Sequence, residues 1–130
     1  MNKEIKTGRI IPNGVSLEKH ENDTIIFFTN LGIDIELIKP SNTPHNKNAD
    51  FIMNGKIWEM KSPQGKSYKT IEHLFEKASK QSQNIVFDLH RSKLDEEKVT
   101  NILTRFFNQS KQVKNMLIIT KNNDLLTFTK

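Results

Sequence analysis

The chemistry that this sequence could perform is concentrated in one short stretch, where Asp50 is followed, after a spacer of eight residues, by Glu59 and then by Lys61. Asn54-Gly55 separates two apolar runs within the stretch and favours a two-residue hairpin turn, because both turn positions take positive φ. In that hairpin Asp50 lies opposite Glu59, with Cβ atoms about 4.5–5.5 Å apart. Opposed carboxylates repel each other, and a divalent cation would remove the repulsion because hard cations take oxygen ligands.

Side-chain alternation along the predicted hairpin separates an apolar face from a polar one. The face expected to enter the core carries Phe51, Met53, Trp58 and Met60, and the other carries Asp50, Ile52, Ile57, Glu59 and Lys61. Lys61 therefore shares a face with both carboxylates, where it could position or polarise a water molecule beside a cation. The alternative interpretation is a solvated polar face, on which Lys61 bridges Glu59 and Asp50 without any cation.

Two more polar side chains interrupt the apolar stripes of predicted helices. Glu21 lies between Leu17 and Ile25 on the first helix, and Gln81 extends the stripe that runs from Leu74 to Ala78 on the second. A carboxylate on a buried face is unfavourable unless it is paired or bound to a metal. Each residue could be an ordinary boundary residue, but several such departures directed toward one place are expected at a functional site.

The elements that must position these residues follow from periodicity, caps and turn formers. Residues 1–16 are predicted to form a polar N-terminal arm, and Ser16 caps a helix that runs to about residue 31, before Gly32. The remaining predicted elements are strands at 33–39, 49–53 and 56–62, a helix at 67–82, a strand at 84–89, a helix at 95–108 capped by Asp95, and strands at 115–120 and 125–129. The order αβββαβαββ predicts one mixed α/β domain over residues 17–130.

Composition restricts the classes of protein further. The chain has 130 residues, which is enough for a single core. Its net charge is +5, from 20 Lys and Arg against 15 Asp and Glu. The absence of cysteine excludes a disulfide scaffold, a thiolate zinc site and a cysteine nucleophile. No apolar run reaches about 18 residues, so we expect no transmembrane segment. The N-terminus, Met1-Asn2-Lys3-Glu4, lacks an apolar h-region, so we expect no signal peptide in this chain. The positive charge is compatible with a polyanionic partner. Whether the protein binds nucleic acid has to be decided from a specific site.

The motif Asp50…Glu59-Met60-Lys61 resembles that of the PD-(D/E)XK nuclease superfamily. The superfamily core has the order αβββαβ, which the predicted elements over residues 17–89 reproduce with the motif on the second and third strands. The resemblance implies a restriction-endonuclease-like α/β fold, here with an added helix and C-terminal strands.

A closer resemblance extends over most of the chain. The C-terminal nuclease domains of contact-dependent growth inhibition toxins and related polymorphic toxins share His20-Glu21, Gly32, Ala49-Asp50, Trp58-Glu59-Met60-Lys61-Ser62-Pro63, Lys80-Gln81-Ser82 and Ile85-Val86-Phe87-Asp88-Leu89. The resemblance implies a metal-dependent endoribonuclease that acts on tRNA in the cytoplasm of a target cell and is neutralised by an immunity protein. Ala49 replaces the proline of the motif, which affects the backbone rather than a ligand. Nothing resembles the large delivery region of such toxins, so we expect an excised domain or a relative serving a mobile element or phage.

This resemblance implies roles for the candidate residues. Asp50 and Glu59 would ligate Mg²⁺ or Mn²⁺ together with the backbone carbonyl of Met60, and Glu21 would join directly or through water. Zn²⁺ is less expected, because the ligands are oxygens and the chain has no thiolate. Lys61 would orient or deprotonate the attacking water, and Gln81 would contact the metal-bound water or the substrate.

Three alternative functions stay open on the sequence. One is a DNA endonuclease of a phage, mobile element or repair pathway, and another is a non-catalytic nucleic-acid-binding module. A third is a metal-independent nuclease with His20 and Glu21 as acid and base, which leaves the pair Asp50 and Glu59 unexplained. Four lysines on or near the second predicted helix are expected to contact the substrate: Lys66, Lys69, Lys77 and Lys80. The alternative interpretation is that these lysines form a solvated face.

Overall fold

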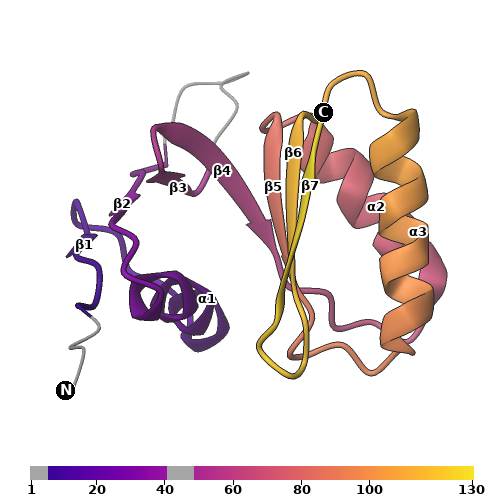
Figure 1. The fold of residues 1–130 in the computed structure, drawn as a ribbon, viewed down its shortest axis with the longest axis horizontal. Helices are drawn as coiled ribbons and strands as arrows, with labels where there is room; N and C mark the ends of the chain where they lie inside the picture. Colours follow the sequence, from indigo (N-terminus) through magenta and orange to yellow (C-terminus); the bar gives the residue numbers. More distant parts are fainter. Residues whose placement is uncertain (1–5, 41–48) are drawn as a thin grey trace, which may run out of the picture.

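A computed structural model describes residues 6–40 and 49–130 of the chain. Over these residues, seven strands form one mixed sheet and three helices cover it, which confirms the predicted mixed α/β class (Figure 1). The elements are β1 (Ile10–Ile11), α1 (Lys19–Asn30), β2 (Ile35–Leu37), β3 (Phe51–Met53), β4 (Lys56–Lys61), α2 (Tyr68–Ser79), β5 (Asn84–Asp88), α3 (Glu96–Gln109), β6 (Asn115–Ile119) and β7 (Leu125–Thr129). No helix within the described ranges is long and apolar enough to cross a membrane.

The strands lie side by side in the order in which they occur along the chain. β1 is parallel to β2, whereas β2, β3 and β4 are antiparallel neighbours. β4, β5 and β6 are parallel, and β7 returns antiparallel to β6. The three connections between parallel neighbours pass through α1, α2 and α3, because a parallel pair needs a crossover rather than a hairpin. The three parallel strands consequently begin at one end of the sheet and finish at the other.

The two faces of the sheet carry separate cores. On one face, α1 supplies Ile25 and Phe28, which pack with Trp58 and Met60 of β4 and with Val86 of β5. On the other face, α2 and α3 pack together over alternate residues of β5 and β6, among them Ile85 and Phe87. Figure 1 shows α1 apart from the α2–α3 pair, which stands beside β5, β6 and β7. Side-chain alternation along β5 therefore divides the molecule into two layers.

The start of α1 differs from its prediction. The helix is capped by Glu18 rather than Ser16, and the backbone N–H of Glu18 donates to the carboxylate of Glu21 over 3.0 Å. This arrangement satisfies a main-chain donor that a helix start otherwise leaves without a partner. Glu21 therefore has a structural role that is independent of any metal. The other two helices begin at the expected places, and the Asp95 side chain accepts from Lys98 N as a cap.

Part of the expected N-terminal arm lies against the sheet. Residues 10 and 11 form β1, which the sequence analysis missed because two exposed residues show no period. The segment is fixed by main-chain contacts: Gly8 N donates to Thr29 O over 2.7 Å, and Arg9 N donates to the Asp34 carboxylate over 2.8 Å. Residues 1–5 of the arm lie outside the described residues.

We expect Gly8→Ala to destabilise the fold, because an added methyl carbon would lie 1.9 Å from the carbonyl oxygen of Ile33. This neighbour is backbone and cannot rotate away, so the cost should be about 1–3 kcal/mol of unfolding free energy. Urea unfolding followed by circular dichroism measures it. Gly65→Ala is the matched control, because the added methyl meets only the Thr70 side chain. Equal losses in both variants would contradict this account of the N-terminal segment.

Candidate active site

The hairpin of β3 and β4 has the predicted register. Phe51 pairs with Trp58 and Met53 with Lys56, and Asn54 and Gly55 both have positive φ, at 53° and 75°. The N–H of Asp50 donates to Trp58 O over 2.9 Å, just beyond the last pair of the ladder. Glu59 lies on the face of the sheet that carries α2 and α3, and its carboxyl group is hydrogen-bonded to that of Asp50. The opposite side chains Phe51, Met53, Trp58 and Met60 are buried, as expected.

Glu59 is a buried acid. It is 3% exposed, and its pKa is raised to about 9 mainly by burial, together with the hydrogen bond to Asp50 and the negative charge of Asp50. The positive charge of Lys61 lowers the pKa of Glu59, but this effect is smaller than the increase caused by burial. Without a cation, Glu59 therefore holds a proton at neutral pH and shares it with the neighbouring carboxylate.

Two buried side-chain atoms in the described part of the chain make no hydrogen bond, and both belong to candidate site residues. They are Oε2 of Glu59 and Oε1 of Gln81. Buried polar atoms without partners are rare and costly in folded proteins. Both atoms are acceptors, so each is suited to a donor or a cation that arrives with a ligand.

The backbone of Met60 completes the surroundings of the carboxylate pair. Its N–H donates to Oδ2 of Asp50 over 2.8 Å. Since the N–H and C=O of a strand residue point to the same edge, the Met60 carbonyl faces the side on which Asp50 lies. Two carboxylates and one carbonyl are the donor types that Mg²⁺ and Mn²⁺ accept, so this donor set fits a hard divalent cation.

Glu21 approaches the motif from the opposite face of the sheet. It lines a small hollow of about 40 Å³ with Met60 and Lys61. Among the described residues, the group of three potential ligands whose atoms lie within 4.8 Å of one another is Glu18, His20 and Glu21. The structure thus places Glu21 beside the backbone of the motif, but not in one carboxylate cluster with Asp50 and Glu59.

Lys61 is close enough to Glu59 for its charge to act on that carboxyl, whereas Gln81 lies at the end of α2. Gln81 follows Lys80, the C-cap of α2, and its N–H donates to Ala78 O over 2.9 Å. Lys61 is half-buried at the end of β4 and is paired in register with Phe87 of β5. The four lysines predicted to contact the substrate, Lys66, Lys69, Lys77 and Lys80, are all exposed on or next to α2.

A second polar group lies where the sequence analysis predicted no site. Asp88 ends β5 with 3% exposure and accepts from the Thr24 hydroxyl over 2.5 Å, so it connects α1 to the sheet. Nδ1 of His90 lies 2.7 Å from the same carboxylate. Arg91 donates to the hydroxyl and carbonyl of Ser62, directly after Lys61. The sequence did contain one signal for this polar group, namely an aspartate directly after the apolar run Ile85-Val86-Phe87.

Comparison with known proteins gives the context of this geometry. Residues 47–125 match the sequence model of the family described as the contact-dependent growth inhibition CdiA C-terminal domain. The fold is similar to one in a CdiA-CT/CdiI toxin and immunity complex from Burkholderia pseudomallei, with a TM-score of 0.72 and 17% identity over 95% of this chain and 100% of that chain. A search of curated proteins found no match.

We expect Glu59→Gln to stabilise the metal-free protein increasingly as pH rises. The raised pKa keeps the proton on folded Glu59, whereas the unfolded carboxyl loses it near pH 4.5. Folding of the wild type therefore becomes less favourable between about pH 4.5 and pH 9, and the amide removes this dependence. Urea unfolding in EDTA at pH 5 and pH 8.5 measures the difference.

The matched control for this experiment is Glu72→Gln, which alters an exposed carboxylate on α2. We expect its pH dependence to follow that of the wild type. If the unfolding free energies of the wild type and of Glu59→Gln differ by the same amount at pH 5 and at pH 8.5, then Glu59 is not a protonated buried acid.

Proposed function

The chain belongs to the contact-dependent growth inhibition CdiA C-terminal domain family, and we propose on this basis that it is a toxin domain that hydrolyses phosphodiester bonds in RNA with a divalent metal ion. The observation that carries the proposal is the pair of half-buried Asp50 and buried Glu59, in which Glu59 has a raised pKa and an oxygen without a partner. A hairpin selected for stability alone would avoid this arrangement. We further propose that the site is of the PD-(D/E)XK type.

The proposed metal ligands are Asp50, Glu59 and the carbonyl of Met60, with Glu21 joining through water from its adjacent hollow. When bound, Mg²⁺ or Mn²⁺ would supply positive charge to the scissile phosphate and lower the pKa of an attacking water. Glu59 has to release its proton when the cation binds, so metal affinity should increase with pH.

Lys61 and Gln81 act on the reacting groups in this proposal. The ammonium of Lys61, on the Glu59 face of β4, would orient the attacking water and stabilise the negative charge that develops on the phosphorane. The amide oxygen of Gln81, which lacks a partner, would accept a hydrogen bond from that water or from the substrate. Asp50 is fixed by the Met60 N–H, so its carboxylate needs little reorganisation.

The proposed substrate is tRNA and the proposed partner is a cognate immunity protein. The similar structure from Burkholderia pseudomallei is a toxin and immunity complex, which supports the partner. The preference for tRNA depends on the family alone, because the site itself recognises a phosphodiester. DNA cleavage is the alternative that the following experiment distinguishes.

We expect the purified protein to cleave tRNA in Mg²⁺ and to leave both tRNA and double-stranded DNA intact in EDTA. Gel electrophoresis of labelled nucleic acid measures the cleavage. DNA-only cleavage would contradict the RNA substrate. Activity that persists in EDTA would contradict the metal mechanism and favour His20 and Glu21, whose polar side-chain atoms lie within 4.8 Å of each other.

We expect Lys61→Ala to lower the rate of tRNA cleavage by about 100-fold or more, because it removes a charge placed at the developing negative charge. Its unfolding midpoint should change little, since Lys61 is only half-buried. Lys93→Ala, which alters an exposed lysine in the loop after β5, is the control for lost charge. Wild-type cleavage by Lys61→Ala would exclude Lys61 from the reaction.

A further inference from the structure

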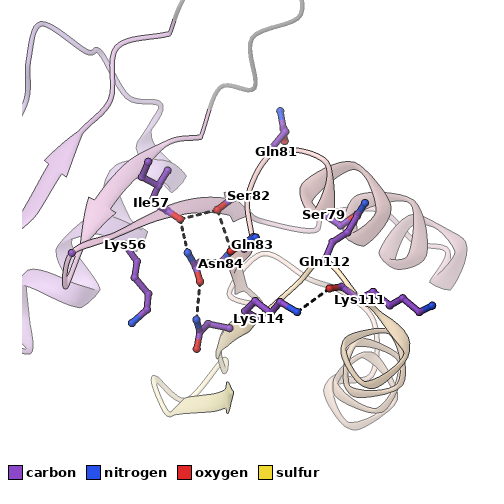
Figure 2. A pocket seen from close by; sticks show the side chains of 12 residues that line it. Lys56, Ile57, Ser79, Gln81, Ser82, Gln83, Asn84, Lys111, Gln112 and Lys114 are labelled. Carbon is purple, nitrogen blue, oxygen red and sulfur yellow. Dashed lines mark hydrogen bonds between the residues drawn. The ribbon is translucent and has the colours of Figure 1, made fainter. Parts of the chain in front are cut away.

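A hollow of about 760 Å³ lies at the end of the sheet where the parallel strands β4, β5 and β6 begin. Figure 2 shows Lys56 on one side of it and Lys111 and Lys114 on the other. These residues come from the hairpin turn and from the segment between α3 and β6, and the parallel pairing brings them together. We call this hollow the basic groove.

The charge of the basic groove is of one sign. Among the residues that the structure describes, its lining includes three lysines and no aspartate or glutamate. In the described part of the chain, no carboxylate lies within ion-pair distance of the ammonium groups of Lys56, Lys111 and Lys114. Concave surfaces with like charges concentrate the field and attract ions of the opposite sign. The groove is therefore suited to a polyanion.

The floor of the basic groove is an ordered polar surface. The Ile57 carbonyl accepts from the Ser82 hydroxyl over 2.7 Å and from the Asn84 amide over 3.0 Å. The Asn115 amide continues this row by donating to Asn84 over 2.8 Å, and Lys114 Nζ is fixed by Lys111 O at 3.0 Å (Figure 2). These bonds hold the edges of β4, β5 and β6 in one arrangement, so the groove is formed before a ligand binds.

The basic groove is next to the candidate active site along β4, and it includes the candidate residue Gln81. Ile57 lines it with 51% exposure and lies two residues before Glu59 on the same face of β4, about 6.5 Å away along the strand. Gln81 also lines the groove, and its Oε1 is one of the two buried acceptors without a partner in the described residues. A chain-like ligand at the carboxylate pair would therefore extend into the groove.

We propose that the basic groove binds the sugar-phosphate backbone of the nucleic-acid strand next to the bond that is cleaved, an inference that rests on the proposed function. The lining offers ammonium and amide donors for phosphate and sugar oxygens. Within residues 6–40 and 49–130, the lining contains no aromatic residue for base stacking, so contact is independent of base sequence. A protein partner fits less well, since Ile57 is the sole large apolar side chain in the lining and interface centres favour aromatic anchors over lysine.

The test is the salt dependence of binding by the triple variant Lys56→Gln, Lys111→Gln and Lys114→Gln. The probe is a fluorescein-labelled 20-nucleotide single-stranded RNA of mixed sequence, measured by anisotropy in EDTA between 50 and 200 mM salt, so that no cleavage occurs. Three lost phosphate contacts should reduce the slope of log K against log salt by about 2 and weaken binding at low salt by about tenfold or more.

The matched control removes three lysines with the same change of charge, Lys93→Gln, Lys98→Gln and Lys121→Gln, which lie beyond the opposite ends of β5 and β6. All six lysines are exposed, so circular dichroism should show unchanged folding in both variants. We expect the control to keep a slope close to that of the wild type. Equal slopes in the two triple variants would overturn the proposal.

Other outcomes separate this inference from the proposed function. A wild-type protein that binds RNA through the three groove lysines but cleaves nothing in Mg²⁺ would contradict the proposed function and support the groove. Cleavage with wild-type RNA affinity in the groove variant would overturn the groove alone. If the groove variant loses binding to labelled polyglutamate but keeps its RNA binding, the proposal is overturned in favour of an acidic protein partner. If the wild type does not bind RNA at all, the proposal is overturned as well.

Discussion

The candidate site depends on the register of one hairpin. The two-residue turn at Asn54-Gly55 fixes which residues of β3 and β4 face each other, and a slip of one residue would move one carboxylate to the other face. Just beyond the end of β3, the main-chain bond from Asp50 to Trp58 and the bond from the Met60 N–H to the Asp50 carboxylate fix Asp50 against β4. The separation of the carboxylates is therefore set by backbone geometry, which is more rigid than side-chain rotamers.

The same hairpin explains how the fold tolerates a buried acid. On either side of Glu59, Trp58 and Met60 are directed to the opposite face, where they pack with α1 in an apolar core. β4 also pairs with strands on both sides, β3 and β5. The unfavourable burial of Glu59 is confined to one position within a well-packed strand. Localised departures of this kind are typical of functional sites, because the surrounding structure compensates for them.

Sequence reasoning succeeded where the signal is local. The Asn54-Gly55 turn and the Asp95 cap were identified because each acts within a few residues. The cap of α1 was misplaced because Ser16 is the better capping type by preference, whereas Glu18 forms a reciprocal pair with Glu21. The basic groove was not predicted, because Lys56 and Lys114 are 58 positions apart and meet only through the parallel order of β4, β5 and β6.

The parallel order of these strands also determines how charge is arranged. Turns and helix ends that precede β4, β5 and β6 gather at one end of the sheet, so lysines that are distant in sequence form one basic groove. The acid pair lies further along the hairpin, where Glu59 is buried on the same face of β4 as Ile57 and Asp50 is its neighbour. The net charge of +5 conceals this separation, because it sums over both regions. A polyanion is attracted by the groove, while the acid pair alone would repel it. The two regions are therefore complementary: the groove supplies long-range attraction, and a cation at the acid pair would reverse the local charge at the point where chemistry is proposed.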